Sequence, residues 1–270
     1  MSDHDISIDE KRVYADRTGT ETLLVGTDRG LAAVAVSADQ IGEFALRTTT
    51  QVRDVAVAGD RVAVADAEDV RVGAGDGETF EETGFGDAVA ASYRDGALLA
   101  AGPEGRIGAY DGDAWTTRGI APTARGADGD LLATADGVYR VTADDVDYAG
   151  LDDANDVAAA GPWAATGDGV YRLGNGWLDE LSGRATAVAA RADHAAAVVD
   201  DGLHEYDGDG WRERDVPLRD LAAVAYGAGA LYAIDSSSTV AVDAGDGWRT
   251  RTIGLPGVTA AAVAEADGNA

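Results

Sequence analysis

A pattern of short apolar runs and tight turns returns along almost the whole chain, at intervals of about 35 residues. In residues 54–72, and again in residues 156–173, an Ala/Val-rich run leads into a Gly-containing turn, a second run, an Asp-containing turn and a third run. The runs are about five residues long and Gly interrupts them too often for helices, so each run predicts a β-strand. The first turn of successive units falls at Gly59, Gly96, Gly129, Gly161, Asp193, Gly229 and Gly268.

The length of the unit predicts how many strands it holds. Four strands of about five residues and four turns of about four fill about 36 residues, which fits a four-stranded β-propeller blade. The first hairpin, residues 22–36, has no clean inner strand before it, and the last run, residues 258–264, has no hairpin after it. We therefore predict an all-β, seven-bladed propeller in a single domain over residues 1–270, with the C-terminal strand closing the ring. Residues 1–16 are left over as an extra strand or an acidic tail, with residues 12–15 as a competing inner strand.

A short motif within the repeat points to a resemblance with a known protein family. The hairpin sequence Asp-Gly-Val-Tyr-Arg occurs at residues 136–140 and again at residues 168–172. With these hairpins and its acidic composition, the chain resembles an uncharacterised family of seven-bladed β-propellers from haloarchaea. The resemblance covers the whole chain and implies the propeller fold, but it carries no established activity.

The charge of the chain limits its partners. Asp and Glu number 49 against 21 Lys and Arg, which gives the 270 residues a formal net charge of −28. Nucleic acid and anionic membranes would repel such a chain, and we expect neither as a partner. The charge predicts a halophile's protein in a salt-rich cytoplasm, where screening relieves self-repulsion.

Other features of the composition exclude further classes of protein. No cysteine is present, so disulfides are excluded. No apolar run approaches the roughly 20 residues of a membrane span, and residues 1–5 lack the apolar start of a secretory signal.

Several residue types that often carry chemistry have simpler interpretations in this chain. Each of four tryptophans follows a Gly/Asp turn and opens an outer strand, where we expect packing roles: Trp115, Trp177, Trp211 and Trp248. This arrangement loosely resembles the Asp-box of sialidase-type propellers, which is a structural turn. The three histidines are too scattered for a catalytic triad or a metal site. The Asp-rich residues 144–147 and 152–156 do not match a calcium-binding loop, so we expect no metal and no cofactor.

The candidate binding residues directly precede the inner-strand runs. In propellers, the residues at which the chain enters the inner strands surround the mouth of the axial channel. We therefore expect Arg53, Arg184 and Arg219 to form a positive arc there. Asp54 and Asp220 follow two of these arginines. Guanidinium groups suit bidentate binding of a carboxylate. The alternative is that the arginines pair with neighbouring carboxylates and hold the blades together.

Two functions stay open at this point. A non-enzymatic binding or scaffold propeller in the cytoplasm, with a protein or an anionic small molecule as its partner, is favoured by analogy of fold. The alternative is a hydrolase, loosely sialidase-like, that acts on an anionic small molecule or glycan at the channel mouth. No nucleophile stands beside the arginines, because Tyr226 ends its strand toward the opposite face, so no catalytic residue is assigned.

Overall fold

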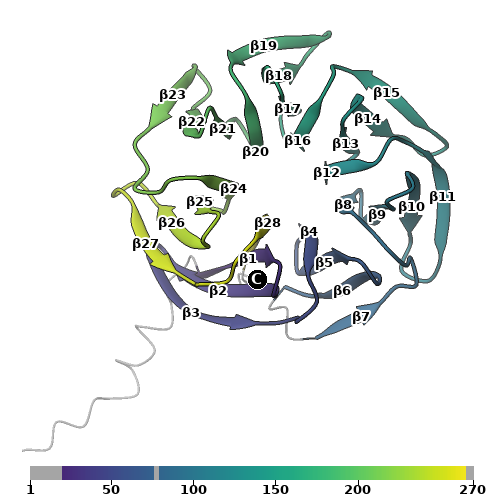
Figure 1. Cartoon of the computed structure of the whole chain (residues 1–270), viewed down its shortest axis with the longest axis horizontal. Helices are drawn as coiled ribbons and strands as arrows, with labels where there is room; N and C mark the ends of the chain where they lie inside the picture. The colour runs from purple at the N-terminus through teal and green to yellow at the C-terminus, as the bar shows by residue number, and fades with distance from the viewer. Residues whose placement is uncertain (1–19, 76–78, 266–270) are drawn as a thin grey trace, which may run out of the picture.

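Seven four-stranded antiparallel sheets surround a central axis, one for each unit of the repeat (Figure 1). The computed structural model describes residues 20–75 and 79–265. Within each sheet, one strand lies nearest the axis and three further strands follow outward. This arrangement confirms the predicted seven-bladed propeller with four-stranded blades. No helix in the described residues is long and apolar enough to span a membrane.

The four strands of each blade follow one another from the axis outward. Blade 1 contains β28 (Val258–Glu265), β1 (Thr20–Thr27), β2 (Gly30–Ser37) and β3 (Gln40–Leu46). Blade 2 contains β4 (Val52–Ala58), β5 (Arg61–Asp66), β6 (Val70–Ala74) and β7 (Phe80–Glu82). Blade 3 contains β8 (Ala90–Arg94), β9 (Ala97–Ala101), β10 (Arg106–Tyr110) and β11 (Trp115–Ile120). Blade 4 contains β12 (Ala124–Asp128), β13 (Leu131–Thr134), β14 (Gly137–Val141) and β15 (Val146–Gly150).

The remaining three blades have the same order. Blade 5 contains β16 (Ala154–Ala158), β17 (Trp163–Thr166), β18 (Gly169–Leu173) and β19 (Trp177–Ser182). Blade 6 contains β20 (Ala185–Arg191), β21 (His194–Val199), β22 (Gly202–Tyr206) and β23 (Trp211–Arg214). Blade 7 contains β24 (Leu221–Tyr226), β25 (Leu231–Asp235), β26 (Thr239–Asp243) and β27 (Arg249–Thr252).

The ring closes through the two ends of the chain. Strand β28 pairs antiparallel with β1, with Thr22 opposite Ala264 and Thr27 opposite Val258. The inner strand of blade 1 therefore comes from the C-terminus and its other three strands from the N-terminal part, as predicted (Figure 1). Residues 12–15, the competing candidate, lie outside the described residues.

The core lies between the faces of neighbouring blades. Seven clusters of buried apolar residues occur, one at each junction between blades. Because both faces of a blade are covered, its strands need not alternate apolar and polar residues. Strand β21 shows this, since five consecutive residues after His194 are buried.

A β-bulge near the start of the inner strand recurs around the ring. In six of the seven inner strands the pairing register skips one residue just after the first paired position. A bulge leaves its extra residue unpaired and redirects that side chain. The six skipped residues are Arg53, Arg125, Asn155, Thr186, Ala222 and Thr259. This backbone feature builds the mouth of the axial channel.

Candidate functional site

The axial channel holds a cavity of about 350 Å³, and all six bulge residues line it. The inner strands of blades 2, 4 and 5 give it its charged side chains: Arg53, Asp54, Arg125, Asp128 and Asp156. Blades 6, 7 and 1 contribute mainly alanines and valines from β20, β24 and β28. One side of the cavity is therefore polar and the other is mostly apolar.

The bulge side chains also join neighbouring blades. Four of them donate a hydrogen bond to a backbone carbonyl at the start of the next inner strand or just before it. These bonds run from Arg53 to Ala88 at 3.0 Å, from Arg125 to Ala154 at 3.2 Å, from Asn155 to Ala185 at 2.8 Å and from Thr259 to Val52 at 2.9 Å. The same position thus performs the same structural task at four junctions. The alternative interpretation of the arginines, that they hold blades together, describes part of what Arg53 does.

Arg53 and Arg125 have a second set of contacts at the mouth. Nη1 of Arg53 lies 2.5 Å from Asp87, and Nη1 of Arg125 lies 2.7 Å from Asp153. The Arg53 side chain is 33% exposed and that of Arg125 is 38% exposed. The hydrogen bonds of both guanidinium groups to described residues leave from Nη1. Their Nη2 and Nε donors therefore remain for solvent or a ligand, and exposed ion pairs of this kind hold their partners weakly.

Asp54 and Asp156 occupy the position after the bulge in β4 and β16. Each carboxyl accepts one bond from the next residue of its own strand and a second bond from the neighbouring blade. The second donors are the amides of Ala91, at 3.0 Å from Asp54, and Val188, at 2.9 Å from Asp156. An inner strand is the edge of its sheet, and its free amides need such acceptors. Both aspartates therefore satisfy edge strands across a blade junction.

Desolvation inside the axial cavity raises the pKa of three of its carboxyl groups. Burial raises the pKa of Asp54 to about 8 and that of Asp156 to about 7, although the backbone amides that they accept from lower both values. Burial also raises the pKa of Asp128, which accepts a hydrogen bond from Ala159 at 2.7 Å. The negative charge of Asp128 raises the other two pKa values further.

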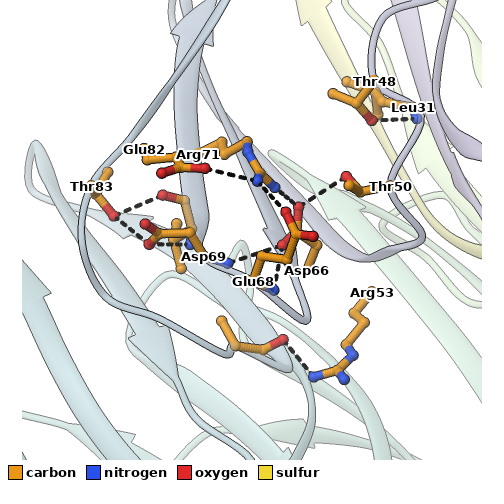
Figure 2. Close-up of polar contacts among 12 residues, drawn as sticks. Leu31, Thr48, Thr50, Arg53, Asp66, Glu68, Asp69, Arg71, Glu82 and Thr83 are labelled. Atoms are coloured by element: carbon orange, nitrogen blue, oxygen red, sulfur yellow. Dashed lines mark hydrogen bonds and ion pairs between the residues drawn. The ribbon is translucent and has the colours of Figure 1, made fainter.

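A separate cluster of acidic residues surrounds Arg71 beside Arg53 (Figure 2). The Arg71 guanidinium is paired with Asp66, and its Nη2 lies 2.8 Å from Glu68 and 3.0 Å from Glu82. Asp66 is only 1% exposed and also accepts bonds from the amides of its own turn. The cluster fixes the turn between β5 and β6, so it belongs to the scaffold of the mouth.

The structure places the predicted site residues in different surroundings. Arg53 and Asp54 line the cavity, whereas Arg184, Arg219 and Asp220 are exposed and outside its lining. The backbone amide of Arg184 donates to Asp200, and Asp220 adopts a positive φ of 53° in a turn. The three arginines therefore do not share the cavity. Whether any of these five residues binds a ligand stays a prediction.

Arg125 and Asn155 are the residues that the predicted arc omits. Both follow an apolar residue at the start of an inner strand, as Arg53 does after Val52. The useful signal is a polar residue second in the inner run, because that is the bulge position. Arg184 and Arg219 precede the first residue of β20 and β24, so they lie before the bulge.

Two of the tryptophans that open outer strands bind the neighbouring blade. Nε1 of Trp115 donates to Thr83 at 3.1 Å and Nε1 of Trp177 donates to Ala149 at 2.8 Å, so both indoles bind across a junction to the preceding blade. Among residues 20–75 and 79–265, no group of three or more His, Asp or Glu side chains could hold a metal ion.

The fold and the cavity define a seven-bladed β-propeller with a partly polar axial site. A model of the HVO_0234-like β-propeller family matches residues 7–264, and the chain belongs to that family. No curated protein is close enough in sequence to count as a relative.

Solved structures that resemble the chain share its fold at low identity. One is the computationally designed protein Ika8, with a TM-score of 0.60, 13% identity and coverage of 91% of each chain. Another is YCF48 bound to D1 peptide, with a TM-score of 0.57 and 13% identity over 74% of this chain and 81% of that one. A third is the extracellular domain of a hybrid two-component system from B. thetaiotaomicron, with a TM-score of 0.59 and 10% identity over 85% of this chain. The present chain spans 36% of that domain.

Proposed function

We propose that this protein is a non-enzymatic binding propeller that takes an anionic group of its partner at the mouth of the axial cavity. The observation that carries the proposal is the placement of Arg53 and Arg125 at bulge positions on the cavity, with Nη2 and Nε donors left over. Two planar guanidinium groups suit the recognition of a carboxylate. The designation of YCF48 as bound to a peptide is consistent with a propeller acting in this way.

The two sides of the cavity indicate what the rest of the ligand looks like. The arginines come from blades 2 and 4, while β20, β24 and β28 supply alanines, valines, two threonines and Tyr226, whose hydroxyl donates to Glu205. A carboxylate on a short aliphatic body would place its charge against the first side and its carbons against the second. A free small molecule and the end of a partner chain both have this chemistry, and 350 Å³ is within the range of small-ligand sites.

The hydrolase alternative has weaker support from the same cavity. A pair of carboxyl groups would have to transfer protons to and from a substrate. Asp54 and Asp156 each already accept two backbone amides, and one of the two bonds joins adjacent blades. Their protonation therefore affects the fold directly, which favours a structural role over a catalytic one.

The proposed setting is a salt-rich cytoplasm. The net charge of −28 supports it, because screening at molar salt reduces the repulsion among carboxylates. Screening also weakens the repulsion that an anionic ligand would meet on approach. The remaining attraction at the mouth is then local, from guanidinium groups in direct contact with the ligand.

Titration calorimetry with succinate in molar potassium chloride tests the proposal. The Arg53→Gln/Arg125→Gln variant is expected to bind succinate at least about tenfold more weakly than the wild type, because both donors are lost. The matched control is Arg184→Gln/Arg219→Gln, which removes the same charge outside the cavity and should leave affinity unchanged. Loss of binding in the control alone, or no binding by the wild type, would overturn the proposal.

A further inference from the structure

A second cavity of about 410 Å³ opens between blades 2 and 3. Its lining includes Arg61, Val72 and Glu81 from blade 2 and Tyr93, Leu98 and Tyr110 from blade 3. Arg61 directly follows the turn that ends β4, and Gly96 lies in the turn that ends β8, so this cleft is at the opposite end of the ring from Arg53. Tyr93 also lines the axial cavity and thus lies between the two spaces.

The junction between blades 5 and 6 shows how the equivalent space can be filled. Trp163 is 2% exposed and packs on Tyr206 and Trp211, with 5.2 Å between ring centroids in both pairs. The Arg172 guanidinium lies 5.0 Å from the centroid of Trp163 and 5.5 Å from that of Tyr206. Its Nη1 also donates to the Tyr206 hydroxyl at 3.3 Å. A guanidinium group therefore completes this junction.

Strand register identifies the equivalent positions in blade 2. Asp156 pairs with Ala165, two residues after Trp163, and Asp54 pairs with Ala65, two residues after Ala63. Trp163 pairs with Arg172, whereas Ala63 pairs with Val72. Blade 2 therefore has alanine and valine where blade 5 has the tryptophan and the arginine.

Blade 3, which faces blade 2, replaces only part of the volume that Trp163 and Arg172 fill in the other junction. Tyr110 pairs with Leu98 and Trp115, as Tyr206 pairs with Ala195 and Trp211. Blade 3 thus carries a leucine where blade 6 has an alanine, and next to it Tyr93 where blade 6 has Ala190. These larger residues take up room that Trp163 fills in the other junction. Among the described residues of blades 2 and 3, none takes the place of Arg172 beside Tyr110, and the cleft lies there.

The charges around the cleft suit a cation. Glu81 pairs with Val72, and the same position in blade 5 is Leu178, which pairs with Arg172. The cleft therefore has a carboxylate where the filled junction has leucine. Asp111 is also on the lining, and the amides of Ala114 and Asp113 lower the pKa of its carboxyl, so it stays ionised. The one cation among the described lining residues, Arg61, donates to the Gly96 carbonyl at 2.9 Å and lies over Tyr93, 4.8 Å from its centroid.

We propose that the cleft between blades 2 and 3 binds the guanidinium group of an arginine side chain, stacked on Tyr110 and facing Glu81. Tyr110 already stacks on Trp115, with 5.1 Å between centroids and 30° between planes, so its ring is held in place. A guanidinium over a fixed aromatic ring is attracted by the electron density of its face. The ligand would occupy the place that Arg172 takes in the other junction. This site is independent of the anion site proposed above.

NMR titration of the full chain with Nα-acetyl-L-arginine amide tests the site. We expect millimolar affinity, about 1–10 mM, because a single exposed cation–aromatic contact is weak. The corresponding citrulline amide has the same shape without the charge and should bind at least about fivefold more weakly. A second titration uses free L-arginine. If free L-arginine binds more tightly than the amide, the natural ligand is a small metabolite; if it binds equally or more weakly, the natural ligand is an arginine side chain of a partner.

Two variants connect binding to the cleft. Val72→Arg supplies the guanidinium that blade 5 already has and should reduce affinity for the amide at least about tenfold, with Val72→Leu as the control of similar packing. Glu81→Gln changes an exposed side chain and should weaken binding about threefold without affecting the fold. The proposal would be overturned if the citrulline amide bound as tightly as the arginine amide, or if the arginine amide did not bind at a concentration about 20-fold above the expected dissociation constant. Unchanged affinity both in Glu81→Gln and in a folded Val72→Arg would overturn it as well.

Discussion

Tyr232 donates a hydrogen bond of 2.6 Å to Glu21 Oε2, and this bond joins the last blade to the first. Glu21 is only 6% exposed and Tyr232 is fully buried. The amide of Ala228 also donates to the Glu21 carboxylate. The end of the Glu21 side chain lies against Gly227, so a Cβ at this position would displace the carboxylate from its donors. The seam therefore has a buried polar contact in addition to the pairing of β1 with β28.

Tyr232→Phe is expected to lower the free energy of unfolding by about 1–3 kcal/mol, because the buried Glu21 carboxylate loses a donor. Burial and the neighbouring Glu21 raise the pKa of Tyr232, so the hydroxyl remains protonated and able to donate. Chemical denaturation measures the loss. The control is Tyr148→Phe, whose hydroxyl bonds to Leu151 on the surface, and it should change stability by less than about 0.5 kcal/mol.

Deletion of residues 258–270 removes β28 and is expected to abolish the cooperative melt. Strand β1 would lose its partner along the axis, and an unpaired edge invites aggregation. Size-exclusion chromatography and a thermal melt check this outcome. Deletion of residues 266–270 alone is the matched control and should leave both unchanged. A monomeric, normally melting 258–270 deletion would mean that another segment, such as residues 12–15, can serve as the inner strand of blade 1.

The repeat predicted the architecture well because the blades differ little in length and the same kinds of turn join the strands in each of them. The closing strand followed from one hairpin without an inner strand and one strand without a hairpin, and β28 confirms it. The candidate site was predicted less completely. Arg53 lies at the cavity, where the sequence placed it, but Arg125 was omitted, because a one-residue bulge decides which polar residue enters the cavity. The cleft depends on which residues pair within blade 2, such as Val72 with Ala63, and within blade 3, such as Tyr110 with Leu98, and apolar periodicity does not define strand register.

The net charge predicts strong dependence of stability on salt. Lowering potassium chloride from molar concentration to about 0.1 M lengthens the screening distance from about 3 Å to about 10 Å, so that more carboxylates repel one another. We expect a lower melting temperature and a less cooperative transition by circular dichroism. Sucrose at matched osmolality controls for general solvent effects. An unchanged melting temperature would contradict the halophilic interpretation.

Raised pKa values in the axial cavity predict that stability falls as pH rises. Asp54 and Asp156 have folded-state pKa values of about 8 and about 7, above the 3.8 of an unfolded aspartate, so the folded state binds more protons between these limits. Their contribution is fully present below pH 4 and is lost as pH rises through 7 and 8. Cavity water moderates the effect, and we expect a loss on the order of 3 kcal/mol between about pH 5 and pH 8.

Denaturation of the Asp54→Asn/Asp156→Asn variant should show a flatter dependence of unfolding free energy on pH over this range, whatever its absolute stability. The control Asp144→Asn/Asp152→Asn removes two exposed charges and should keep the wild-type slope, because general repulsion changes equally in both variants. Equal slopes in all three proteins would show that these carboxyl groups are ionised in the folded state.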